Sequence, residues 1–116
     1  MGNNGRCAKI YGLIGLAAKK GSVVSGGYAC EKALKYGEDG MVILAGDSSE
    51  NTRERFGRLS RNKGKELIVF GSRSELGRRI GKGERSVMIL TDRGLARGIR
   101  VLLGFAADEN GGVKFG

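Results

Sequence analysis

Residues 41–45, Met41-Val-Ile-Leu-Ala45, form one apolar run between two glycines. A strand that is apolar at every position is typical of the centre of a sheet that is covered by helices on both faces. Similar runs occupy residues 67–70 and 87–90, and a shorter β-type run, Ser22-Val-Val-Ser25, precedes them all. The sequence therefore predicts a mixed sheet of about four strands, with the three longer runs as buried strands.

Helical patterns separate these strands. Ile10, Leu13, Ile14 and Ala17 have the i, i+3, i+4, i+7 spacing of a helix that is buried on one side, which predicts a helix over about 7–20. A second helix is expected from Gly26-Gly27 to Gly37, a third over about 48–63, a short one that holds Leu76 and Ile80, and a last one that holds Leu95, Ile99 and Leu102.

Two finer features of these helices are also predicted. Asp47 and Glu50 have the spacing of a capping box, so Asp47 is expected to cap the third helix, as Thr91 or Asp92 caps the last. Gly12 and Gly15 each cost about 1 kcal/mol relative to Ala inside a helix. This cost favours close packing of another backbone against both positions.

Strands that alternate with helices across short connections imply helical layers on both sides of one sheet. We therefore expect an α/β fold, a three-layer α/β/α sandwich. A chain of 116 residues fits one domain, 1–116, with an ordered core over about 7–104 and a flexible, Gly-rich C-terminal tail.

The charge of the chain is strongly positive and unevenly spread. Lys and Arg number 21 against 12 Asp and Glu, which gives a formal net charge of +9. Residues 53–100 hold 14 basic and 5 acidic side chains, and the remaining residues hold 7 of each. Such an excess favours polyanionic partners, with nucleic acid as the leading candidate.

Several function classes lack the residues that they need. The chain has no histidine and only two cysteines, Cys7 and Cys30, which removes the usual zinc sites and every Ser-His or Cys-His nucleophile. Neither the P-loop nor the dinucleotide-binding pattern is present. We expect no catalytic residues, no metal, no cofactor and no small-molecule substrate.

The cysteines also indicate a compartment. With no signal peptide and no apolar run of about 20 residues, the sequence predicts no membrane association and a reducing environment, the cytoplasm, in which both thiols are free.

Basic residues are grouped in the second half of the chain. The predicted third helix carries Arg53, Arg55, Arg58 and Arg61 and only two large apolar residues, Phe56 and Leu59, so most of its surface should face solvent. Arg53, Arg58, Arg61, Arg78 and Arg79 are predicted to form an auxiliary basic patch. Because aromatic residues are few, we expect recognition of RNA shape and backbone rather than stacking on unpaired bases.

Three stretches taken together resemble one protein family. They are Leu16-Ala-Ala-Lys-Lys-Gly-Ser-Val-Val-Ser-Gly26, Val42-Ile-Leu-Ala-Gly-Asp-Ser-Ser-Glu-Asn-Thr52, and Glu75-Leu-Gly-Arg-Arg-Ile-Gly-Lys82 with Thr91-Asp92 after the last strand. Their order and spacing, over about residues 8–103, resemble the ribosomal-protein superfamily of kink-turn RNA binders, in particular its bacterial YlxQ-like branch. The resemblance implies an α/β/α domain that binds RNA at a sharp bend within ribosomes or other ribonucleoproteins, with ribosomal proteins as candidate neighbours.

The resemblance also implies an RNA site. The family builds it where the second helix begins, with help from the loop before the last strand. The matching positions are Gly26, Gly27, Tyr28, Lys32 and Lys35 on the helix and Lys82, Gly83 and Arg85 in the loop. Backbone N–H groups at a helix start suit phosphate, which agrees with this placement.

The helix start departs from the family pattern at two positions. Strong kink-turn binders carry Asn and Glu where this chain has Tyr28 and Ala29. Backbone recognition is therefore expected to survive better than base-edge recognition. For Tyr28, stacking on a base, a bond to phosphate and simple packing remain open.

A second function is compatible with the same fold. The superfamily also includes stress-signalling proteins that bind proteins, so the alternative is a protein-interaction adaptor without specific RNA recognition. The net charge of +9 favours RNA.

Overall fold

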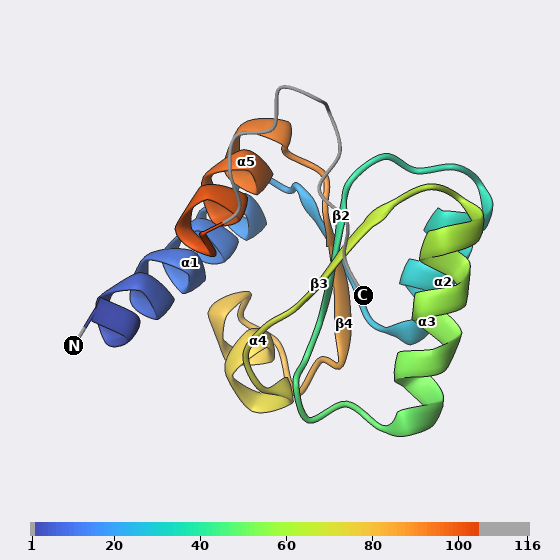
Figure 1. The fold of residues 1–116 in the computed structure, drawn as a ribbon, viewed down its shortest axis with the longest axis horizontal. Coiled ribbons are helices and arrows are strands. Elements are labelled where there is room, and N and C mark those ends of the chain that lie inside the picture. Colours follow the sequence, from blue (N-terminus) through green and yellow to red (C-terminus); the bar gives the residue numbers. More distant parts are fainter. Residues whose placement is uncertain (1, 105–116) are drawn as a thin grey trace.

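The computed structural model describes the backbone of residues 2–104 and the side chains of residues 5–104. These residues form α1 (Gly2–Lys19), β1 (Val23–Ser25), α2 (Gly27–Lys35), β2 (Met41–Leu44), α3 (Glu50–Asn62), β3 (Glu66–Val69), α4 (Arg73–Arg79), β4 (Val87–Leu90) and α5 (Arg93–Leu102). Figure 1 shows the sheet between α1, α4 and α5 on one side and α2 and α3 on the other. The predicted α/β/α sandwich is confirmed, whereas the predicted C-terminal tail lies outside the described residues.

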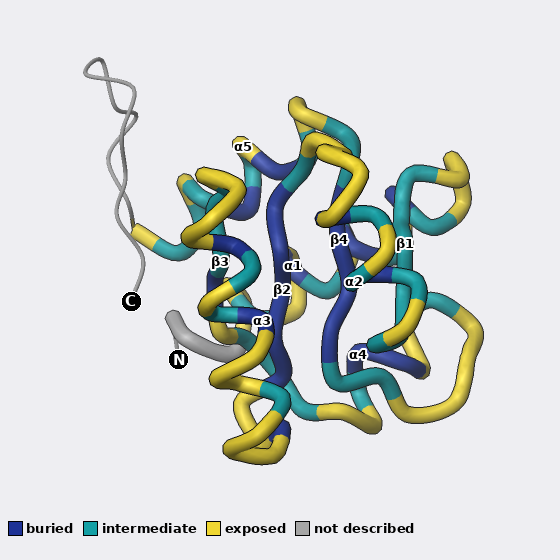
Figure 2. The backbone as a smooth tube through the Cα atoms, turned by 90° about the vertical axis from the view of Figure 1, so that its right-hand side faces the viewer, coloured by how far each residue is buried: buried dark blue, intermediate teal, exposed yellow. Residues whose placement is uncertain are grey.

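The sheet has four strands in the order β1-β4-β2-β3. β4 pairs antiparallel with both β1 and β2, whereas β2 and β3 are parallel. β2 and β4 are buried at every position, as their dark traces in Figure 2 show. The runs that begin at Met41 and Val87 are therefore the central strands of a mixed sheet, as predicted.

The third apolar run differs from its prediction because β3 is an edge strand. It pairs only with β2, and no other strand among residues 2–104 lies along its outer edge. Ile68 is its one buried residue, and Val69 is 50% exposed. An apolar run does not reveal how many neighbours a strand has, so the prediction of a third fully buried strand was wrong.

Apolar clusters pack on both faces of the sheet. On one face, Ile14 of α1 packs with Leu76 of α4 and Ile99 of α5. On the other, Leu34 of α2 packs with Phe56 of α3. All five side chains are fully buried, and the burial of a side chain of this size contributes about 1.5–3 kcal/mol. The two clusters fix which helices share a layer.

The first helix is longer than predicted, since it begins at Gly2 rather than near residue 7. A Cβ at Gly15 would lie 3.4 Å from the carbonyl oxygen of Arg79, so another backbone does pass close there. At Gly12 no neighbour in the described part of the chain would lie within 4 Å of a Cβ, so that part of the prediction was wrong. None of the described helices is both long and apolar enough to cross a membrane.

The cap of α3 is also corrected by the structure. Ser49, not Asp47, is its N-cap, and its Oγ accepts the backbone N–H of Thr52 at 3.1 Å. Asp47 instead accepts the backbone N–H of Arg73 at 2.8 Å, which ties the β2–α3 loop to the start of α4. Asp92 caps α5, one of the two residues predicted to do so.

Asp92 joins two elements through its carboxylate. Its Oδ1 accepts the Leu95 N–H at 2.9 Å, and its Oδ2 accepts a hydrogen bond from Nζ of Lys20 at the end of α1. The hydrogen bonds from Lys20 and then from Leu95 hold the pKa of this carboxyl below its ordinary value of 3.8. Because the pKa of Asp92 is lower in the folded state, the ionised carboxylate stabilises the fold at pH values above the pKa of the unfolded state. That stabilisation is lost as the pH falls through the folded pKa.

We predict that Asp92→Asn reduces the acid sensitivity of the fold. Asn keeps an oxygen that can cap α5 but has no ionised form, so the contribution that acid removes from the wild type is absent. Urea unfolding midpoints measured from neutral pH to below pH 3.8 should fall less in this variant. Lys20→Ala, which leaves the capping carboxylate, should shift the acid response in the same direction. An identical fall of the urea midpoint with pH in the wild type and in both variants would contradict the prediction.

Candidate nucleic-acid interface

Four connections meet at one end of the sheet. The carboxyl ends of β1, β2 and β3 and the amino end of β4 lie there because β4 is antiparallel to its neighbours. At this end the chain passes from β1 into α2, from β2 into α3, from β3 into α4 and from α4 into β4, as Figure 1 shows. Both parts of the site predicted from the sequence, the start of α2 and the loop at 80–86, belong to this edge.

The start of α2 has backbone hydrogen bonds at its N-cap but no side-chain cap. Gly26 has φ 97°, a left-handed conformation that favours glycine. Its N–H donates to the carbonyl of Val87 at 3.0 Å, and its carbonyl accepts from Cys30 at 2.9 Å. No side chain caps this helix, although side chains cap α3, α4 and α5, and no acidic residue lies in its first turn. The first N–H groups of α2 are therefore suited to an anionic ligand.

The exposed face of α2 carries the predicted side chains. Tyr28 is 81% exposed, so its ring is not part of the core, which removes the packing alternative for this residue. Lys32 is exposed and has no ion pair among the described residues. Lys35 is also exposed but pairs with Glu31 at 3.1 Å.

Arg55 lies beside the start of α2, which the sequence did not indicate. A Cβ at Gly27 would lie 3.3 Å from Nη2 of Arg55, and Nη1 of Arg55 lies 3.5 Å from a carboxylate oxygen of Glu31. Arg55 belongs to α3, which packs against α2. The sequence places it among the third-helix arginines, but only the packing of the two helices brings it to this site.

The loop at 80–86 is folded tightly onto α4. A Cβ at Gly77 would lie 1.8 Å from the carbonyl oxygen of Gly83, so only glycine allows this approach. The N–H of Lys82 donates to the Gly77 carbonyl at 2.8 Å, and the N–H of Arg85 donates to the Arg73 carbonyl at 3.0 Å. Lys82 and Gly83 are exposed at the tip, whereas Arg85 is half-buried. The loop is thus presented in a defined position.

The residues predicted as one auxiliary basic patch are divided between two layers. Arg53, Arg58 and Arg61 are exposed on α3, whereas Arg78 and Arg79 lie on α4, across the sheet. Both α4 arginines form ion pairs with Glu75. Their hydrogen bonds hold the pKa of the Glu75 carboxyl below its ordinary value, and the bond from Arg78 has the larger effect. The five residues therefore do not form a single surface.

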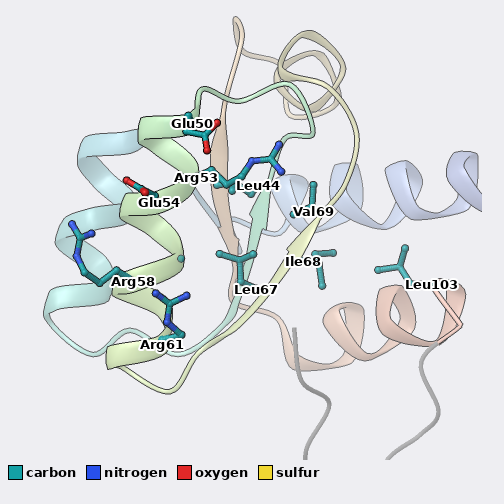
Figure 3. A pocket seen from close by; sticks show the side chains of 11 residues that line it. Leu44, Glu50, Arg53, Glu54, Arg58, Arg61, Leu67, Ile68, Val69 and Leu103 are labelled. Atoms are coloured by element: carbon teal, nitrogen blue, oxygen red, sulfur yellow. The ribbon is translucent and has the colours of Figure 1, made fainter. Parts of the chain in front are cut away.

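A groove runs between α3 and the exposed edge of β3, with a volume of about 690 Å³. It is lined by Leu44, Glu50, Arg53, Glu54, Gly57, Arg58, Arg61, Leu67, Ile68, Val69 and Leu103. Figure 3 shows Arg53 extending toward the strands, where its Nη2 donates to the Gly46 carbonyl at 2.8 Å, while Arg58 points away from them. Because two glutamates share the groove with three arginines, its walls are mixed in charge.

The cysteines are free thiols, as predicted. Sγ of Cys30 lies 3.4 Å from the Val24 carbonyl oxygen, and burial raises the pKa of this thiol to about 12. A thiol with so high a pKa is almost wholly protonated at neutral pH and is a poor nucleophile. Among the residues that the structure describes, no group of three or more His, Cys, Asp and Glu side chains is arranged to hold a metal ion.

The fold and this edge define a class: a small α/β/α domain that presents an uncapped helix start and a fixed basic loop side by side. The sequence matches the model of the ribosomal protein L7Ae/L30e/S12e/Gadd45 family over residues 8–97. The chain belongs to this family, as its three sequence stretches predicted.

Relatives with similar sequences and folds agree with this assignment. RNA-binding protein YlxQ of Bacillus subtilis is 33% identical over 93 residues, which cover 80% of this chain and 93% of the relative. A solved structure of a Bacillus halodurans protein of unknown function is 33% identical, with a TM-score of 0.77 over 83% of this chain and 97% of that one. The Giardia lamblia 15.5kD RNA binding protein shares the fold at 19% identity, with a TM-score of 0.70 over 85% of each chain.

We predict that Gly77→Ala displaces the loop at 80–86. The added methyl group cannot occupy a position 1.8 Å from the Gly83 carbonyl oxygen, so either the loop or α4 must move. Overpacking of this kind costs about 1–3 kcal/mol, which urea unfolding would measure, and amide exchange in the loop should become faster. Gly12→Ala is the matched control, because it adds the same methyl group to a helical glycine with open space around it. A similar loss of stability in Gly77→Ala and Gly12→Ala would contradict the prediction.

Proposed function

We propose that the protein binds structured RNA at a sharp, kink-turn-like bend, through the start of α2 and the loop at 80–86. The observation that carries this proposal is the uncapped start of α2, with exposed Lys32 on the helix and exposed Lys82 in the loop at the same edge of the sheet. Two relatives bear names that describe them as RNA-binding proteins, which supports RNA as the ligand.

Each part of this surface has a proposed contact. The N–H groups of Gly27 and the residues after it bind phosphate oxygens at the bend, where the partial positive charge of the helix start favours an anion. Lys32, Lys35 and Lys82 neutralise flanking phosphates, and the exposed backbone of Gly83 allows close approach. Arg85 belongs to the same surface, although its donors are largely used within the protein.

The third helix supplies a secondary contact in this proposal. Arg58 and Arg61 are exposed on α3, the helix that packs against α2, and neither has an ion pair within residues 5–104. They would lengthen the track that an RNA backbone can follow beyond the bend. Arg78 and Arg79 are less suited to this role, because Glu75 offsets part of their charge.

The proposed activity is binding without catalysis, in the cytoplasm and within a ribosome or another ribonucleoprotein, where ribosomal proteins would be neighbours. Membership of the ribosomal protein family supports this setting.

We predict that Lys32→Ala and Lys82→Ala each weaken binding to a kink-turn RNA and reduce its salt dependence. Each lost phosphate contact should lower the slope of log affinity against log salt by about 0.9. Fluorescence anisotropy at several salt concentrations, with a straight duplex of the same length as reference, measures both quantities. Arg97→Ala is the control, because it removes an exposed charge from α5, in the opposite layer. It should change neither the affinity nor its salt dependence.

Three results would contradict this function. They are affinity that does not depend on salt, equal binding of bent and straight RNA, and a loss of affinity in Arg97→Ala equal to that in Lys32→Ala and Lys82→Ala. The protein-interaction alternative would be supported if the chain showed no RNA affinity and its protein partners stayed bound after RNase treatment.

A second prediction concerns the contact that Tyr28 makes. If its exposed ring stacks on a base of the bend, Tyr28→Phe should retain full affinity and Tyr28→Ala should lose about 1–3 kcal/mol. If the hydroxyl binds phosphate instead, both substitutions should weaken binding to a similar extent. The same anisotropy titration separates the two contacts, and full affinity in both variants would exclude Tyr28 from the interface.

A further inference from the structure

One side chain bridges the two halves of the edge described above. Nε of Arg85 donates to Oγ of Ser25 at 3.2 Å, and Ser25 is the last residue of β1, directly before the start of α2. Nη1 of Arg85 donates to the carbonyl oxygen of Glu84 at 2.9 Å and lies 3.4 Å from that of Gly83. Three of the five N–H donors of this guanidinium are therefore used inside the protein.

The backbone around Arg85 is anchored as well. Its N–H donates to the carbonyl of Arg73 at 3.0 Å, and the N–H of Arg73 donates to Oδ1 of Asp47 at 2.8 Å. Nη1 of Arg73 also lies 3.8 Å from Oε1 of Glu84. Arg85 thus stands where the end of β1, the loop at 80–86 and the start of α4 meet.

Lys82, in the same loop, has a different environment. Its side chain is exposed and has no ion pair or side-chain hydrogen bond among the described residues, so its ammonium can face a phosphate. Arg85 is half-buried, and turning its Nε or Nη1 toward a phosphate would break its bonds to Ser25 or to the loop carbonyls. The two basic residues of the loop are therefore built for different tasks.

We propose that Arg85 is a positioning residue, which, with Ser25 as its partner, fixes the distance between the start of α2 and the loop at 80–86. The inference rests on the proposed RNA-binding function and assigns Arg85 a role other than that of a phosphate ligand. A fixed spacing lets both halves meet one bent RNA without an ordering cost at binding. It also makes the spacing itself a determinant of which bend fits.

The test compares affinity with salt dependence. Arg85→Ala, Arg85→Lys and Ser25→Ala should each weaken binding of a kink-turn RNA about three- to tenfold while leaving the salt slope at its wild-type value. Lys82→Ala, from the same loop, should lower that slope by about 0.9. Ser25→Thr keeps a hydroxyl acceptor and should restore affinity, and the double variant Ser25→Ala/Arg85→Ala should bind no more weakly than Arg85→Ala alone.

Two results would overturn the proposal. One is a fall in salt slope for Arg85→Ala as large as that for Lys82→Ala, because Arg85 would then neutralise a phosphate directly. The other is a double variant whose loss equals the sum of the two single losses, because the two side chains would then act independently.

A measurement on the free protein separates this inference from the proposed function. Ser25→Ala and Arg85→Ala should speed amide exchange in residues 81–86 and at Gly26 without a matching change in the urea midpoint. Unchanged exchange would overturn the bridging role even if RNA binds. Faster exchange in a protein that binds no RNA would refute the proposed function while leaving the bridge between the two segments supported.

Discussion

The antiparallel pairing of β4 with both β1 and β2 is the contact on which the rest of the structure depends. It places the first residue of β4, Val87, beside the end of β1, where the Val87 carbonyl accepts the N–H of Gly26. The loop that leads into β4 must then lie next to the start of α2. The bridge from Arg85 to Ser25, two residues 60 positions apart, is a consequence of this strand order. The backbone thus creates the two-part edge, and the side chains decide what it can bind.

Pairing, more than the net charge, decides where the positive charge of this protein is available. Glu66 accepts two hydrogen bonds from Arg100, at 2.7 and 2.8 Å, and Glu75 holds two arginines of α4. Lys32, on α2, and Lys82, in the loop at 80–86, have no such partners within the described residues. No acidic side chain among the described residues offsets the charge of these two lysines, and the uncapped start of α2 adds the partial positive charge of a helix N-terminus.

The sequence predicts the layers of this fold better than it predicts their edges. The runs at 41–45 and 87–90 could be identified as central strands because helices on both faces leave no polar position. The run at 67–70 looks the same, but its number of neighbours depends on strand order, which no local pattern encodes. Ser49 and Asp47 are both good caps, and the choice between them depends on Arg73, which occupies the Asp47 carboxylate. The site elements followed from family resemblance, whereas Arg55 and Ser25 join the site only through contacts between distant segments.

The position of β4 in the sheet also determines when the binding edge comes into existence. During synthesis the residues of α2 emerge early, but the loop that completes the edge is made some 50 residues later and is held in place only by the following strand. A nascent chain therefore contains Lys32 well before it has a joined surface. The two-part edge is in this sense a property of the finished sheet, and a chain that stops short of β4 has Lys32 without the loop that completes the edge.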